Sequence, residues 1–497
     1  MCYNLSVLTK LFFSIFNLNL RIMNFFYKTI IIVFISFIFF NFLSNDEIKI
    51  IKRENPNFIF YLADDQDKLD YGVYGNPNVE TSAVDMLSSE GMRFNNFYTA
   101  QAICSPTRSQ IFTGKYPIKN GCFINHVGVK PDIKTVINYL ENEGYEVVLA
   151  GKSHVKPKSV FEWTKFLDLV SVDNSKPRYL PMNKIEKYLS NVKKPFCLII
   201  ASTFPHGPYP STNEYKKEDI YKLPYSADNV PSFKTGYYQN IKEDNIQIKD
   251  VLELVDKYGF KDNSMFVYAA DHGISGKWGL SEQGLKAPFI VRWPGVIKSN
   301  SESNVILSFV DVVPTFLDII NADIPKSIDG LSFYNTLKGD DSEIHDYIFG
   351  VSTMQNIQKC KVFPSRMVRS KKFKYIKNFN SIDVYERNFG DNPIVNKFIE
   401  IGAKSFPNKP FEELYDLDID PYQRNNLIND IEYSDIKLEL ELALKDWMIS
   451  QDDILINNKM PLIKPTLHPL DKNSKWNKVS SELENKLTQY DYVELHY

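Results

Sequence analysis

The chain has 497 residues and a formal net charge of −3 at pH 7, with 58 Lys and Arg against 61 Asp and Glu. This balance lacks the positive field that nucleic-acid binding needs, so we expect no nucleic-acid partner. The length suffices for a large α/β domain with additions or for more than one domain. The five cysteines are scattered, which excludes a disulfide scaffold and a CxxC metal site, although one disulfide remains compatible with the sequence.

An apolar run near the N-terminus predicts a targeting segment. Residues 30–40 follow Lys28 and precede polar residues. The run has the length of a signal-peptide core and is shorter than a comfortable bilayer span. Met23 is a plausible start, and no A-x-A cleavage motif follows. We therefore expect residues 1–45 to be a signal peptide or an uncleaved N-terminal anchor, and the protein to be exported to the periplasm or the extracellular space, in the second case anchored to the membrane.

Short apolar runs typical of buried strands alternate with helical patterns as far as residue 293. Strands are predicted at 57–63, 96–100, 145–150, 196–202, 264–270 and 288–293, and helices at 82–90, 104–113, 133–143 and 239–258. This alternation predicts an α/β fold, with a mainly parallel sheet sandwiched between helices.

The pattern changes after about residue 345. Residues 366–379 and 412–428 predict antiparallel strands with an Asp-Pro turn, and a helix is expected near 434–449. We therefore expect a catalytic domain over residues 50–345 and a smaller α+β subdomain, with an antiparallel sheet and a polar tail, over residues 346–497.

Charged side chains and histidines follow four of the predicted strands, at the point where each strand ends. They are Asp64 and Asp65, then Lys152 and His154, then His206, and finally Asp271 and His272. Ligand sites in open α/β sheets lie at the carboxyl ends of the strands. We therefore expect these side chains to meet in one site.

The three carboxylates of this set predict a metal site. Without a cation, converging carboxylates would repel one another and raise each other's pKa. Oxygen-rich ligation favours Ca²⁺, with Mg²⁺ as the alternative, and His272 adds a nitrogen. The competing interpretation is that Asp64 and Asp65 only end a strand and cap a turn.

A cysteine, a proline and an arginine stand close together at the start of the helix predicted at 104–113. Pro106 suits a first helical turn, and Arg108 lies one turn beyond Cys104 on the same face. A buried structural cysteine is the alternative. Lys152 and His154 point to one side of an extended backbone, which suits anion binding beside a proton acceptor. A solvated lysine and a loop histidine would give the same pattern.

The chain resembles the type I sulfatases of the alkaline-phosphatase superfamily. The matching motifs occur in the family's order between about residue 55 and residue 428: NFIFYLADD, CSPTRSQIFTGKYP, GKSH, FPHGP, AADHG, LKAPFIVRWPG, DVVPTFLDI and ELYDLDIDPYQRNNL. The segments GKSHVKPKSVFEW and INHVGV resemble the branch of carbohydrate sulfatases that contains heparan N-sulfatase.

This resemblance implies that Cys104 is oxidised to formylglycine (3-oxoalanine) by a formylglycine-generating or anaerobic sulfatase-maturating enzyme. It also implies a Ca²⁺ ion held by Asp64, Asp65, residue 104, Asp271 and His272, although many members have Asn where this chain has His272. The roles that it implies for other residues are orientation of the formylglycine by Arg108 and binding of the sulfate by Lys152, His206 and Lys286.

The implied reaction is hydrolysis of a sulfate ester or N-sulfate of a sulfated carbohydrate. The formylglycine hydrate attacks sulfur, His206 or Lys286 protonates the leaving group, and His154 takes a proton as the covalent sulfo-enzyme breaks down. His126 either contacts the substrate or is a structural loop residue. The alternatives are a phosphonate or phosphate ester hydrolase of the same superfamily and a non-catalytic glycan-binding homologue. The sequence makes no prediction of oligomeric state.

Overall fold

The computed structural model describes residues 55–172, 176, 178–222, 230–353, 365–379 and 410–457. All of these belong to one compact unit. The predicted targeting segment and the polar tail lie outside the described residues. Within those ranges, no helix has the length and apolarity that crossing a membrane requires.

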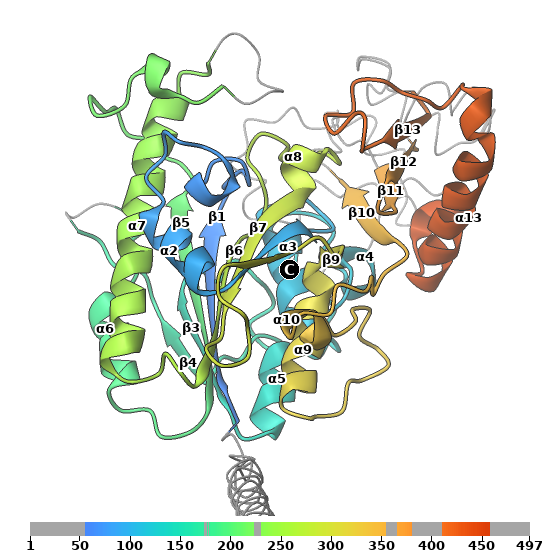
Figure 1. Cartoon of the computed structure of the whole chain (residues 1–497). Coiled ribbons are helices and arrows are strands. Elements are labelled where there is room, and N and C mark those ends of the chain that lie inside the picture. Colours follow the sequence, from blue (N-terminus) through green and yellow to red (C-terminus); the bar gives the residue numbers. More distant parts are fainter. Residues whose placement is uncertain are drawn as a thin grey trace, which may run out of the picture. The chain divides into compact units, whose positions relative to one another are not determined.

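The larger sheet has the strand order β4-β3-β5-β1-β6-β7-β2-β8, with β9 also paired to β2 (Figure 1). All of its strand pairs are parallel except those that β7 makes with β6 and β2. The predicted mainly parallel sheet is therefore confirmed. Its strands are β1 (Asn57–Asp64), β2 (Met92–Tyr98), β3 (Glu146–Gly151), β4 (Lys165–Leu167), β5 (Phe196–Pro205), β6 (Ser264–Ala270), β7 (Lys286–Arg292), β8 (Ser301–Ser303) and β9 (Leu307–Ser308).

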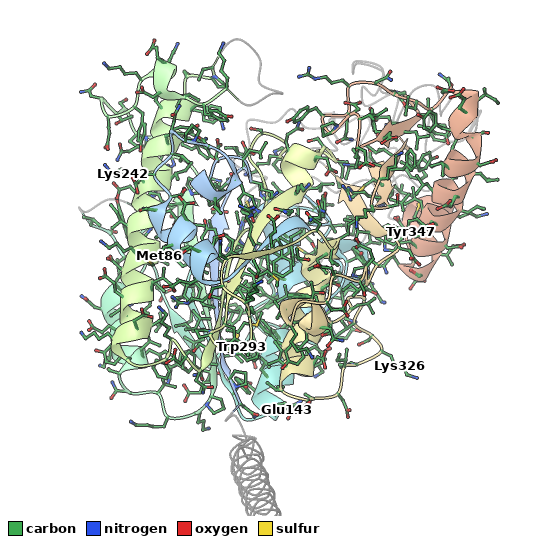
Figure 2. All side chains as sticks on the ribbon, viewed as in Figure 1. Met86, Glu143, Lys242, Trp293, Lys326 and Tyr347 are labelled. Carbon is green, nitrogen blue, oxygen red and sulfur yellow. The ribbon has the colours of Figure 1, made fainter. Side chains whose placement is uncertain are left out.

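Helices cover both faces of this sheet because alternate strand residues point to opposite sides. Along β1, Phe58, Phe60 and Leu62 join one buried apolar cluster, and Ile59 and Tyr61 join another. Side chains fill the space between sheet and helices on both sides (Figure 2). The first cluster includes residues of α3 (Cys104–Thr113), α5 (Val136–Asn142), α9 (Val312–Ile319) and α10 (Tyr334–Leu337), and the second includes residues of α2 (Ser82–Glu90), α6 (Met182–Leu189) and α7 (Lys234–Lys257).

Several short helices lie in the connections. They are η1 (Gly72–Tyr74), α4 (Pro117–Asn120), η2 (Lys217–Asp219), α8 (Glu282–Leu285), η3 (Phe309–Asp311), η7 (Ile431–Tyr433) and η8 (Ile454–Asn457).

The second sheet is antiparallel, as predicted, with the order β10-β11-β12-β13. Its strands are β10 (Ile348–Ser352), β11 (Ser365–Arg369), β12 (Phe373–Asn378) and β13 (Glu412–Asp416), and α13 (Ser434–Ser450) packs on β11 and β12 (Figure 1). Tyr347, labelled in Figure 2 just before β10, donates a hydrogen bond of 2.6 Å to Glu439 of α13. The predicted boundary at residues 345 and 346 falls just before β10.

The two sheets share buried apolar contacts. Tyr98 and Leu285, from the larger sheet and the helix before β7, lie in one cluster with Ile348 and Met367 of the second sheet. The Val351 N–H also donates a hydrogen bond of 2.7 Å to the Ala100 carbonyl, in the segment that leads to α3. The second sheet therefore supports the segment that positions Cys104.

Some element boundaries differ from the predicted ones. The strand expected at 96–100 begins at Met92, directly after Gly91, because it pairs with β8 as well as with β7. The helix expected from 133 begins at Val136, where the side chains of Thr135 and Asn138 form a capping box. The helix expected from 239 begins at Lys234.

Candidate active site

Four parallel strands bring the predicted site residues to one edge of the larger sheet. The strands β3, β5, β1 and β6 are consecutive neighbours, so their carboxyl ends lie side by side (Figure 1). These ends carry Lys152 and His154, then His206, then Asp64 and Asp65, and finally Asp271 and His272.

The acidic residues and His272 form a buried cluster. The Asp65 N–H donates to Asp271 Oδ1 over 3.0 Å, and His272 Nε2 lies 3.1 Å from Asp65 Oδ1. Asp65 has a left-handed backbone (φ 67°), which turns the chain back toward the cluster. Burial raises the pKa of Asp271. Burial acts in the same direction on Asp64, but the charges of Lys152 and Arg108 outweigh it and hold the pKa of that carboxyl well below its usual range.

Cys104 is the first residue of α3, as predicted, and it is buried beside this cluster of side chains. Its Sγ lies 3.5 Å from His272 Nε2 and 3.8 Å from Asp65 Oδ1. Burial raises the pKa of the thiol well above its ordinary value, so the unmodified residue is a protonated thiol rather than a nucleophilic thiolate.

The donor atoms around Cys104 fit a divalent cation. Potential ligand atoms of Asp65, Cys104 and His272 lie within 4.8 Å of one another, and so do those of Asp64, Cys104 and Asp271. Asp271 Oδ2 is buried and forms no hydrogen bond among the described residues. A carboxylate-rich set of this kind suits Ca²⁺ or Mg²⁺ better than Zn²⁺.

Arg108 contacts two carboxylates of the cluster and the end of β3. Its fully buried guanidinium donates to the Lys152 carbonyl (3.0 Å) and to Asp64 Oδ1 (3.3 Å), and its Nε lies 3.4 Å from Asp271 Oδ2. Arg108 therefore links the ends of β1, β3 and β6 and sets the position of two carboxylates.

Lys152 and His154 both reach the site from the end of β3. Lys152 Nζ lies 2.5 Å from Asp64 Oδ2. His154 Nε2 lies 2.8 Å from His126 Nδ1, which places His126 at the site as well. Burial, followed by the charges of Lys152 and His126, lowers the pKa of His154 well below its ordinary value. His154 is therefore neutral near pH 7, and its buried Nδ1 has no hydrogen-bond partner among the described residues.

His206 lies at the solvent side of the site, with 42% of its side chain exposed. Its Nε2 is 3.6 Å from Asp65 Oδ2, and its Nδ1 is 2.8 Å from the Gly207 carbonyl. A substrate that reaches Cys104 from solvent would therefore meet this imidazole.

One residue expected at the site has other surroundings in the structure. Lys286, expected to bind the sulfate, is the first residue of β7 and pairs with Tyr98 of β2. Its Nζ lies over the Tyr98 ring, 5.7 Å from the centroid. The ammonium group beside Cys104 belongs instead to Lys277, whose Nζ lies 2.7 Å from Asp65 Oδ2 and 3.9 Å from Cys104 Sγ.

Sequence reasoning missed Lys277 because it does not follow a strand directly. It stands in the loop ISGKWGLS between β6 and α8, and no spacing rule separates it from other surface lysines. Its position depends on the loop path, in which the Trp278 N–H donates to the Ala102 carbonyl (3.0 Å), two residues before Cys104.

A cysteine at a helix start, surrounded by carboxylates, histidines and lysines at the ends of parallel strands, defines a hydrolase site of the sulfatase class. The family model described as "Sulfatase" matches residues 56–322, and the model "N-sulphoglucosamine sulphohydrolase, C-terminal" matches residues 270–391. The chain belongs to the sulfatase family and is a sulfuric ester hydrolase of its carbohydrate sulfatase branch.

Similar proteins support this assignment. The chain is 48% identical over 450 residues to an ulvan-active sulfatase of Formosa agariphila, an alignment that covers 88% of this chain and 90% of the relative. A solved structure in complex with its substrate D-glucosamine-2-N,6-O-disulfate has a TM-score of 0.62 at 21% identity and covers 82% of this chain and all of the other. A solved 2-O glycosaminoglycan sulfatase has a TM-score of 0.65 at 21% identity, covering 84% and 96%.

Proposed function

We propose that this sulfatase removes sulfate from a sulfated polysaccharide or its oligosaccharides, and that residue 104 does so as formylglycine. The observation that supports the proposal most is the position of Cys104. It stands at a helix N-terminus, where backbone N–H groups favour an anionic oxygen, with Lys277, Lys152 and His206 around the same carboxylates. A protonated, buried thiol has little reactivity of its own, which agrees with prior oxidation.

The hydrate of formylglycine would supply the nucleophilic oxygen for attack on sulfur, through the covalent sulfo-enzyme that the family resemblance implies. Asp64, Asp65, Asp271 and His272 would hold a Ca²⁺ ion, which supplies Lewis-acid polarisation of the reacting oxygens when bound.

The chain's own residues have separate tasks in this proposal. The ammonium groups of Lys152 and Lys277 bind sulfate oxygens and stabilise the charge that develops on them. His206, which faces solvent, protonates the departing sugar oxygen or nitrogen. Neutral His154 accepts the proton that the second hydroxyl of residue 104 releases when inorganic sulfate leaves, and its hydrogen bond to His126 fixes the imidazole.

The relatives support the choice of substrates to test. An ulvan-active sulfatase shares 48% of its aligned residues with this chain, so ulvan is the first substrate to test. N-sulfated and O-sulfated glucosamine are the second, because a structural neighbour binds a glucosamine disulfate.

The decisive experiment combines mass spectrometry with a substrate screen. The protein is produced together with a formylglycine-generating or an anaerobic sulfatase-maturating enzyme, and the peptide that contains residue 104 is weighed. We expect the aldehyde, and sulfate release from ulvan oligosaccharides, in the same preparation. Full activity in a preparation with only unmodified Cys104, or in Cys104→Ala, would falsify the chemistry. Activity on phosphate esters alone would refute the substrate class.

A further inference from the structure

A second group of basic side chains lies beside α8, between the two sheets. It lines a cavity of about 220 Å³. Lys68 comes from the loop after β1, Lys286 from the start of β7 and Arg369 from the end of β11. None of these three is among the basic residues that surround Cys104.

The cavity has more positive than negative charge. Glu282 is the carboxylate among its lining residues, and its oxygens are already engaged. They accept hydrogen bonds from Tyr98 Oη (2.8 Å) and Lys374 Nζ (3.1 Å), and one lies 3.4 Å from Arg369 Nε. One lining carboxylate therefore faces the charges of three lining basic side chains, those of Lys68, Lys286 and Arg369. Asp418 adds negative charge near Arg369, and Glu413 adds negative charge near Lys374 behind the cavity.

Two of these ammonium groups have no acidic partner in contact. Lys68 Nζ donates one hydrogen bond to the Asn95 carbonyl (3.0 Å) and lies over the Tyr74 ring. Within the part of the chain that the structure describes, Lys286 Nζ forms no hydrogen bond or ion pair and has only the Tyr98 ring beside it. Burial and the charge of Lys286 lower the pKa of Lys68 to about 7, and burial lowers the pKa of Lys286.

A charge that is withdrawn from water without a partner is costly, and an anion in the cavity would remove that cost. The free donors of Lys68 and Lys286, with the guanidinium of Arg369, match the several acceptor oxygens of a carboxylate or sulfate. We propose that this cavity is a second oxyanion-binding site, separate from the site at Cys104.

The chain connects this cavity closely to the active site. Lys68 stands three residues after Asp65 in the loop that follows β1. The Gly273 N–H, next to His272, donates a hydrogen bond to the Gly284 carbonyl of α8 (3.1 Å). The oxyanion is thus either a second charged group of the bound sugar chain or free sulfate. The first source rests on the proposed function, whereas the binding site itself does not.

Selenate, a sulfate analogue that gives an anomalous X-ray signal, tests the site without any need for activity. Crystals of Cys104→Ala are soaked in sodium selenate. We expect one anomalous peak near residue 104 and a second in the cavity, within hydrogen-bond distance of Lys286 Nζ. The second peak should vanish in a Cys104→Ala, Lys286→Met variant and persist with the exposed control Lys298→Met. A peak near residue 104 alone overturns the proposal. Lys68→Met serves if Lys286→Met does not fold.

Kinetics on the modified enzyme then identify the source of the oxyanion. Two substrates are compared, a sulfated disaccharide that carries a uronic acid and the same disaccharide with its carboxyl group reduced to an alcohol. If the sugar supplies the oxyanion, Lys286→Met raises KM for the charged substrate about 10-fold and leaves KM for the reduced one unchanged. Equal KM ratios, together with a lost selenate peak, assign the cavity to free sulfate. A chain that cleaves no sulfated sugar fails the proposed function alone, because the selenate result still decides the site.

Discussion

Lys277, in the loop after β6, and Lys286, the first residue of β7, have different surroundings in the fold. Lys277 points toward Asp65 and Cys104. Lys286 points toward Tyr98 and lines the cavity beside α8. The difference arises from the backbone, because the loop that carries Lys277 is held to the Ala102 carbonyl through Trp278, whereas Lys286 is fixed by its register in β7. A sequence motif that contains both lysines therefore does not identify the one that meets the substrate.

The different contributions of Lys277 and Lys286 to catalysis can be measured with a small aryl sulfate as substrate. Lys277→Met removes a positive charge beside the reacting group, so kcat/KM should fall about 10²- to 10³-fold. The loss of kcat/KM in Lys286→Met should be at least about 10-fold smaller, since the Lys286 ammonium group lines the cavity beside α8 and not the site at Cys104. Steady-state kinetics on both variants, with residue 104 shown by mass spectrometry to be fully converted, make the comparison. An equal loss in both variants would mean that Lys286 also contributes to binding the sulfate group.

The carboxylate cluster predicts a stabilising effect of Ca²⁺. Three buried carboxylates share one site, and a cation that binds the folded chain raises its stability by mass action. We expect Ca²⁺ to raise Tm after treatment with EDTA, by about 1 °C for each 1 kcal/mol of binding free energy in a unit of this size. Asp65→Asn should abolish this increase, and the exposed control Asp341→Asn should retain it. Thermal melts that respond identically in all three proteins would contradict a Ca²⁺ site.

At the scale of single elements, the start of α9 is tied to the segment before β10. Asp311 accepts backbone hydrogen bonds from Ser308 (2.8 Å) and Leu331 (2.9 Å), and His345 Nε2 lies 2.9 Å from its Oδ2. Burial lowers the pKa of His345, but the negative charge of Asp311 outweighs it and the pKa of His345 is raised above its usual value. This contact fixes the chain where it passes from the first sheet to the second.

The pair predicts a pH dependence of stability. Because the pKa of His345 is higher in the folded than in the unfolded chain, its contribution is fully present below about pH 6.5 and is lost as pH rises through the folded-state value. The free energy of unfolding of the wild type should thus exceed that of His345→Gln by roughly 1–3 kcal/mol at pH 6 and by less at pH 9. Urea titrations at both pH values measure this. A difference that grows with pH would show the wrong sign and refute the pair.

The alternation of apolar runs predicted the elements well, because a strand buried on both faces must be apolar throughout. The runs at 57–63 and 264–270 lie within β1 and β6, and the helix predicted at 82–90 is α2. The site residues that directly follow β1, β3, β5 and β6 could be predicted to lie together because the carboxyl ends of neighbouring parallel strands meet at one edge of the sheet. Lys277 could not, since a loop path depends on contacts such as that of Trp278 with Ala102. The reversed direction of β7 and the cavity between the sheets also depend on tertiary packing.

At the scale of the whole molecule, the two sheets form a continuous structure around Cys104. The carbonyl groups of Ala100, in the segment before Cys104, and of Trp278, next to Lys277, accept hydrogen bonds from Val351 and Ser352 of β10. Deeper in the second sheet, Arg366 of β11 forms a buried, two-pronged ion pair with Asp453, with Nε–Oδ2 and Nη2–Oδ1 distances of 2.5 and 3.1 Å. We infer that loss of the second sheet would release the segment that leads to Cys104.

This inference predicts one cooperative unfolding transition for the described unit. Arg366→Met leaves Asp453 buried without its cation, at a cost of about 3–5 kcal/mol, and the double variant Arg366→Met, Asp453→Leu should recover at least half of that. Urea unfolding is followed by near-ultraviolet circular dichroism and by residual sulfatase activity at each urea concentration. In Arg366→Met both midpoints should move to lower urea together, because the shared apolar cluster couples the sheets. Two separate transitions, with activity surviving the first, would mean that the larger sheet holds the active site without help from the second.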